Sequence, residues 1–167
     1  MDHKRALLKH FLAALAYRTQ KALRDAPPDF ASFRAAPKIR TPGELIRHMD
    51  SVLGYARTFF TGGRYRAPLL PDFHDAVEHF HETLADVAEH LERGTELRGI
   101  TAEILLQGPL SDAMTHVGQL AVLRRLAGSP VPPENFVFAD ISATNLGSDQ
   151  PPPVSPDKDW PEAPDGD

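Results

Sequence analysis

Apolar residues recur every three or four positions along four stretches of this chain, which is the pattern of amphipathic helices. Proline pairs, glycines and short polar runs separate the stretches, and little in the sequence favours strands. Amphipathic helices joined in this way predict an all-α protein, and four of them predict a four-helix bundle. The expected helices span about Asp2–Leu23, Thr41–Phe60, Asp72–Glu92 and Thr101–Ala127.

Two of these helices carry specific signals at their boundaries or within them. Thr41 stands where it can cap the second helix, with Pro42 in the first turn and Glu44 as the partner residue of a capping box. In the fourth helix, Gly108-Pro109 predicts either an internal kink or a break before the main part.

The chain becomes rich in proline after Pro130. Apolar residues between Val131 and Ile141 suggest a segment that lies along the surface of the bundle. From Gln150 to Asp167 the composition is that of a linker or a disordered tail, with Trp160 as its expected anchor. The sequence therefore predicts a bundle domain, residues 1–140, followed by a Pro-rich C-terminal tail, residues 141–167.

Composition narrows the functional classes. The 167 residues carry a net charge of −5 without a block of like charge, which does not favour a nucleic-acid or membrane partner. A locally basic groove around Arg57, Arg64 and Arg66, or around Arg124 and Arg125, is the alternative. The absence of cysteine excludes disulfides, Cys-based zinc sites and thiol catalysis by the protein itself. No signal-type or membrane-spanning stretch is apparent, so we expect a cytoplasmic protein.

The most informative polar residues are Asp112 and His116 in the fourth helix. Four residues apart, they lie on one helix face. That face also carries Leu105, Val122 and Leu126, so we expect it to point into the core. A carboxylate and an imidazole in a core need compensation, which either a metal ion or a hydrogen bond between the two could provide.

His48 is the third residue of interest. It falls on the predicted apolar stripe of the second helix, formed by Leu45, His48/Met49, Val52, Tyr55/Ala56 and Phe59. It is either a buried, hydrogen-bonded histidine or a third ligand for an ion held by Asp112 and His116.

The other histidines favour surface positions. His74, Glu78 and His81 share one face of the third helix at spacings that suit a metal, but this face points away from the apolar stripe. We therefore expect a solvated polar face there, and surface positions for the remaining histidines, namely His3, His10, His79 and His90. The chain contains no nucleophile elbow, phosphate loop or dinucleotide fingerprint.

Several motifs, taken in order, resemble the DinB/YfiT-like superfamily over about residues 1–140. The resemblance implies a four-helix bundle, often dimeric, that holds a divalent metal through three histidines. By position His48 matches the first ligand and His116 the last, whereas Asp112 stands where the family has its middle histidine. The motifs are Tyr17-Arg18, Thr41-Pro-Gly-Glu-Leu-Ile-Arg-His48-Met, Asp112-x-x-x-His116-Val-Gly-Gln119-Leu and Arg124-Arg-Leu-Ala-Gly128-Ser-Pro-Val-Pro-Pro133.

The resemblance implies a metal-dependent transferase or hydrolase that acts on a small molecule, with a low-molecular-weight thiol as a candidate cofactor. Zinc or nickel suits the mixed imidazole and carboxylate set, and the carboxylate also suits iron or manganese. Gln119 and Thr115 are expected to support the ligands, Glu44 to orient His48, and Arg18 or Arg57 to pair with an anionic group. The alternative is a non-catalytic, dimeric, stress-related binding bundle in which Asp112 and His116 form a buried ion pair.

Overall fold

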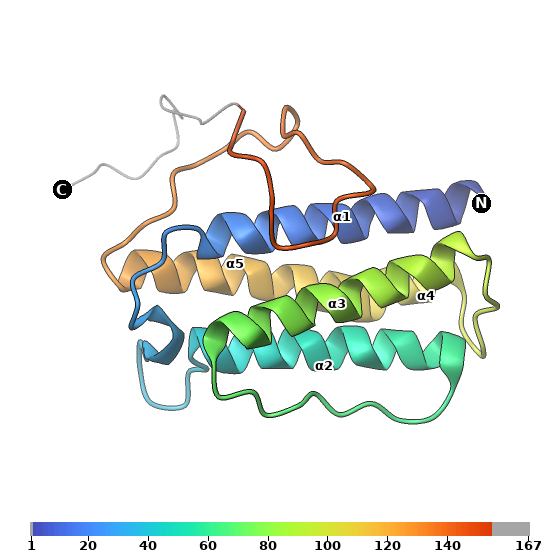
Figure 1. Cartoon of the computed structure of the whole chain (residues 1–167), viewed down its shortest axis with the longest axis horizontal. Helices are drawn as coiled ribbons and strands as arrows, with labels where there is room; N and C mark the ends of the chain where they lie inside the picture. The colour runs from blue at the N-terminus through green and yellow to red at the C-terminus, as the bar shows by residue number, and fades with distance from the viewer. Residues whose placement is uncertain (1, 155–167) are drawn as a thin grey trace.

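The computed structural model describes residues 2–154, and these residues form helices and connecting segments without a β-strand. This confirms the predicted all-α class (Figure 1). The fourth predicted helix is divided into a short helix, a π-helical turn and a longer helix. The elements are α1 (His3–Leu23), the 3₁₀ turn η1 (Phe30–Ser32), α2 (Pro42–Thr61), α3 (Phe73–Glu92), α4 (Ala102–Leu105), η2 (Leu106–Leu110) and α5 (Ser111–Leu126).

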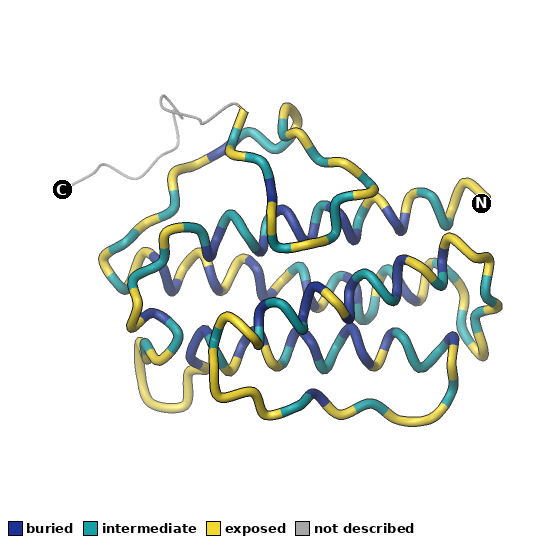
Figure 2. Tube along the Cα trace, viewed as in Figure 1, coloured by how far each residue is buried: buried dark blue, intermediate teal, exposed yellow. Residues whose placement is uncertain are grey.

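The four long helices pack as a bundle in which each contacts two neighbours. α1 packs against α3 and α5, and α2 packs against the same two helices (Figure 1). Apolar side chains from all four helices fill the space between them, and the buried positions follow the inner faces of the helices (Figure 2). Leu12, Leu53, Phe80, Leu84 and Leu120 are fully buried members of this core.

The predicted capping box fixes where α2 begins. Glu44 N donates to Thr41 Oγ1 at 3.2 Å, and Thr41 N donates to Glu44 Oε2 at 2.7 Å, so both residues satisfy free backbone groups of the first turn. Pro42 occupies the first turn, where its missing N–H carries no cost. The start of α2 sets the register that positions His48.

The predicted kink at Gly108-Pro109 is a π-helical turn that joins α4 to α5. Gly108 has a non-helical ψ of −105°, and Pro109 has no N–H to continue the helical ladder. Ser111 Oγ donates to Leu106 O at 2.7 Å across the turn. As a result α5 begins at Ser111, and Asp112 lies in its first turn.

The segment after α5 packs on α1, as predicted for residues 131–141. The Tyr17 hydroxyl donates to Glu134 Oε1 at 2.6 Å, and the Arg18 guanidinium lies 3.7 Å from the centre of the Phe136 ring. Further along, the carbonyl oxygen of Gln150 accepts a hydrogen bond from Arg24 at 2.7 Å. The expected anchor Trp160 lies outside the described residues.

Two predicted helix faces are wrong by part of a turn. Tyr55, expected with Ala56 on the buried stripe of α2, is 57% exposed, because the buried face runs through the predicted Met49 and Ala56 and through Leu53, which the stripe did not include. In α5, Val122 and Leu126 are exposed, and the side that faces the core carries Ala113, Val117, Leu120 and Leu123. None of the helices in residues 2–154 combines the length and the apolar character needed to cross a membrane.

Candidate metal centre

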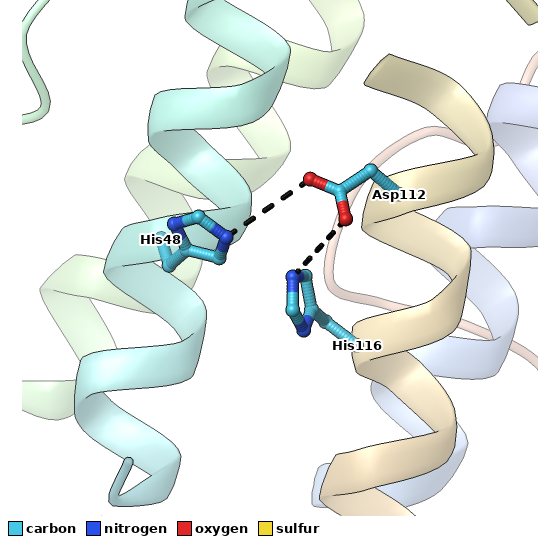
Figure 3. A group of neighbouring side chains, drawn as sticks. All are labelled: His48, Asp112 and His116. Atoms are coloured by element: carbon cyan, nitrogen blue, oxygen red, sulfur yellow. Dashed lines mark ion pairs between the residues drawn. The ribbon is translucent and has the colours of Figure 1, made fainter. Parts of the chain in front are cut away.

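The three residues singled out in the sequence lie together between α2 and α5 (Figure 3). His48, Asp112 and His116 each offer one ligand atom, and these atoms all lie within 4.8 Å of one another. Asp112 is between the two imidazoles, with Oδ2 4.0 Å from His48 Nε2 and Oδ1 3.4 Å from His116 Nε2. No second group of three such side chains is found in the part of the chain that the structure describes.

Two helices supply these side chains, α2 from one side and α5 from the other (Figure 3). Asp112 and His116 are one turn apart on α5, so both side chains project in the same direction. The imidazole of His48 approaches from α2, with its ring centre 4.6 Å from that of His116 and the two ring planes at 77°. This arrangement is the one expected if all three side chains share one small ion.

The site is closed at one end and open at the other. The His116 side chain is 8% exposed, whereas those of His48 and Asp112 are 31% and 50% exposed. Asp112 was expected to face the core, and that expectation is wrong because half of its side chain is exposed. The solvent side gives a small molecule access to the ligand atoms.

His116 has a ring nitrogen that finds no hydrogen-bond partner among residues 2–154. Its Nδ1 donates to Gln119 Oε1 at 3.1 Å, so Nδ1 carries the hydrogen and Nε2 carries the lone pair. Nε2 is buried without a hydrogen bond and faces Asp112. Nearly all buried polar atoms have a partner, and a histidine ligand normally donates its other N–H to a supporting group. These residues therefore fit a metal ion.

The electrostatics of His48 also suit a metal ligand. Burial lowers the pKa of its imidazole, the positive charge of Arg40 lowers it further, and the negative charge of Asp112 acts in the opposite direction. The neutral imidazole, which is the form that binds metals, is thereby favoured. Neither oxygen of Asp112 accepts a hydrogen bond from the described residues, so both are available to a ligand.

The structure agrees only in part with the alternative of a buried ion pair between Asp112 and His116, because the two groups are close but Asp112 is not buried. Half of the Asp112 side chain is exposed, and the 3.4 Å approach of Oδ1 to His116 Nε2 leaves that nitrogen without a hydrogen bond. An ion pair of this kind contributes little to the free energy of unfolding. A purely structural role therefore explains the arrangement poorly.

The expected supporting residues are only partly in place. Gln119 contacts His116 as predicted, whereas Thr115 donates to Ser111 O within its own helix and is exposed. Glu44 belongs to the capping box and accepts from Arg34 at 3.0 Å, so its contacts are with the start of α2 and not with His48.

The two arginines predicted to pair with an anionic group have other partners. Arg18 covers Phe136 on the far side of α1, and Arg57 pairs with Asp86 on α3.

Two polar contacts in the core were missed in the sequence. His81, expected on a solvated face, is only 3% exposed: Nδ1 donates to Leu146 O at 2.8 Å, and Nε2 accepts from Gln20 Nε2 at 2.9 Å. Its partners come from distant segments, so the spacing of residues within α3 could not reveal them. His90 also departs from the surface position expected, because its ring stacks on Phe60.

The second contact surrounds the buried carboxylate of Asp50. Tyr65 OH donates to it at 2.9 Å, and His79 Nδ1 lies 3.3 Å from Oδ1. Gly54 makes this possible, since a Cβ at that position would lie 1.9 Å from the Tyr65 ring. The sequence offered one signal for this contact, an aspartate on the buried side of the second helix. The predicted apolar stripe did not include Asp50, so the signal was not used.

Comparisons of the chain with protein-family models, with curated proteins and with solved structures find no match. The superfamily resemblance, the homodimer and the cytoplasmic location therefore stay predictions. The function proposed for the chain is inferred from the geometry of the centre.

Proposed function

We propose that the protein binds a divalent metal ion through His48, Asp112 and His116 and uses it as an open-sided reaction centre. The buried Nε2 of His116 is the observation that carries the proposal. It has a lone pair, no hydrogen-bond partner among the described residues, and a carboxylate and a second imidazole within reach. A metal ion compensates all three groups at once.

The ligand set narrows the choice of metal. Zinc and nickel accept two imidazoles and one carboxylate, and iron(II) and manganese are favoured further by the harder carboxylate oxygen. Three protein ligands leave positions for a small molecule, which is typical of catalytic centres and not of structural ones. The half-exposed Asp112 marks the open side.

The reaction class we propose is that of a metal-dependent transferase or hydrolase acting on a small molecule, in line with the DinB-like resemblance. A bound divalent ion would supply Lewis acidity, which activates water or a low-molecular-weight thiol. Gln119 holds the imidazole of His116 in the ligating tautomer. Asp112 contributes a negative charge where the resemblance implies a neutral histidine, which lowers the tendency of the centre to acidify its ligands.

The direct test is metal binding by the full, untagged chain after removal of bound metal with a chelator. Calorimetric titration with Zn²⁺ and Mn²⁺ should give one site, and His48→Ala should weaken it by at least about tenfold, since a whole ligand is lost. His74→Ala is the matched control, because His74 also lies one turn from an acid, with Nδ1 4.0 Å from Glu78 Oε1, but is exposed.

Equal binding by wild type and His48→Ala would place the site elsewhere, and no binding by wild type would favour the non-catalytic bundle. Asp112→His provides a complementary variant. It restores the three-histidine set that the resemblance implies, so zinc binding should survive this exchange if the ligand geometry is correct.

A further inference from the structure

A pocket of about 450 Å³ adjoins the proposed centre on the side of α2 that carries His48. This volume lies within the usual range for small-molecule sites. Its wall is formed by the first turns of α2 and by the segment that precedes this helix. The lining residues are Arg34, Lys38, Ile39, Arg40, Glu44, Arg47, His48 and Ser51.

The segment that precedes α2, residues 34–40, is held against this helix by specific hydrogen bonds. Arg34 Nη1 donates to Ile39 O at 2.5 Å, and Arg34 Nη2 donates to both oxygens of Glu44 at 3.0 and 3.2 Å. Lys38 adopts a left-handed conformation with φ of 66°, which is unusual for a residue other than glycine. Such a conformation persists where the surrounding structure enforces it. The pocket wall is therefore built by tertiary contacts and not by a random surface loop.

The charges around the pocket are unbalanced. Glu44 is the only acidic residue in the lining, and Arg34 already pairs with it. Lys38, Arg40 and Arg47 form no ion pair with any carboxylate in residues 2–154. Three uncompensated cations thus face one cavity, although the chain as a whole has a net charge of −5. A local positive field of this kind attracts anions.

The position of the pocket links this field to the proposed centre. His48 lines the pocket and also belongs to the ligand group with Asp112 and His116. Arg40 lines the same pocket as His48. A molecule in the pocket would therefore contact His48, one of the three candidate ligands.

We infer that this pocket binds an oxyanion, a carboxylate or phosphate group of the small molecule on which the centre acts. Lys38, Arg40 and Arg47 recognise the anionic group, and the reacting part of the molecule extends past His48 towards Asp112. The inference rests on the proposed function for the role of the centre, but the anion site itself needs no metal.

The test is titration of the ¹⁵N-labelled full chain with malonate and, separately, with inorganic phosphate, followed by NMR, in the metal-free and the zinc-treated protein. Low ionic strength is used because salt screens exposed charges. We expect shifts concentrated at residues 34–51 and an affinity that falls about tenfold in the double variant Lys38→Gln/Arg40→Gln. Arg66→Gln, an exposed arginine outside the lining, is the charge-matched control and should leave the affinity unchanged.

The outcomes separate the two proposals. Weaker anion binding in the double variant supports the pocket. Unchanged anion binding in the double variant, or shifts away from residues 34–51, overturns it whatever the result for zinc. If wild type binds the anion but not zinc, the pocket is supported and the proposed metal function fails. The stronger of malonate and phosphate binding tells whether carboxylate or phosphate is the preferred group.

Discussion

Two histidines in this bundle are buried to nearly the same degree but differ in one hydrogen bond. His81 is 3% exposed and His116 is 7% exposed. In each ring Nδ1 donates to an oxygen, that of Leu146 in one case and that of Gln119 in the other. At Nε2 they differ, because His81 accepts from an amide, whereas His116 has no hydrogen-bond partner in the part of the chain that the structure describes.

The difference separates a structural histidine from a candidate ligand. His81 joins α1, α3 and the C-terminal segment, and both of its nitrogens are satisfied by the protein. His116 directs a lone pair at a half-exposed carboxylate and a second imidazole. Burial alone therefore says little about function, whereas an unsatisfied nitrogen beside other ligand atoms is informative.

The two histidines should differ most in how their loss affects the free energy of unfolding of the metal-free protein. His81→Ala leaves Gln20 and the carbonyl of Leu146 without a partner, and we expect the free energy of unfolding to fall by about 3 kcal/mol. His116→Ala should cost about 1 kcal/mol, because its only bond is to the exposed Gln119. Urea denaturation of the metal-free variants measures both. Equal losses would contradict the distinction between the two histidines.

Adding metal should reverse the order, so that the loss of His116 lowers the free energy of unfolding more than the loss of His81. With free Zn²⁺ at a hundred times its Kd, wild type should gain about 2.7 kcal/mol in the free energy of unfolding. His81→Gln should show the same gain, since His81 is not a ligand, and His116→Ala should show almost none. Thermal unfolding with and without Zn²⁺ provides the measurement. A gain in His116→Ala that matches wild type would exclude the proposed ligand set.

Part of this contrast could be predicted from the sequence. The i,i+4 spacing indicated that Asp112 and His116 share a face, the capping box fixed the register of His48, and Gln119 was expected beside His116. His81 was misassigned because its partner Leu146 follows it by 65 residues and packs on it only through the tertiary fold. Tyr55 was misassigned because a shift of one residue rotates a helical stripe by about 100°.

The basic pocket was not foreseen for a similar reason. Arg34, Lys38 and Arg40 lie in a connection without periodicity, and the bonds of Arg34 that arrange it depend on the folded chain. Sequence patterns indicate which side chains share a helix face. They do not indicate how an irregular segment folds over that face.

The supporting glutamines offer a finer comparison. Gln119→Ala should weaken zinc binding about tenfold by releasing the His116 ring, with little change in stability. Gln20→Ala should leave zinc affinity unchanged and lower the free energy of unfolding by about 1 kcal/mol, because it removes the donor to His81. Calorimetry and urea denaturation of both variants test this pair. If both variants bound zinc more weakly, the cause would be a general loosening of the bundle and not the release of the His116 ring.

The smallest expected effect is a pH dependence of stability. Burial lowers the pKa of His81 from its ordinary value of 6.5, so below that pH the unfolded chain takes up a proton that the folded chain refuses. Stability of the metal-free protein should therefore fall as the pH drops from 7 towards 5, by up to about 1.4 kcal/mol per pH unit for this one group.

His81→Gln should make this slope shallower, and His74→Gln, which changes an exposed histidine, should not. Urea denaturation across this pH range provides the slopes. An unchanged slope in His81→Gln would mean that His81 is not the neutral, doubly bonded histidine of the structure.

The most direct test of the account is the position of a bound ion. A crystal of the zinc-loaded protein, measured at the zinc absorption edge, should show one anomalous peak between α2 and α5. We predict that the peak lies about 2.0–2.2 Å from a His48 nitrogen, from His116 Nε2 and from a carboxylate oxygen of Asp112. A peak at other side chains, with none beside His116 Nε2, would contradict the proposed metal centre.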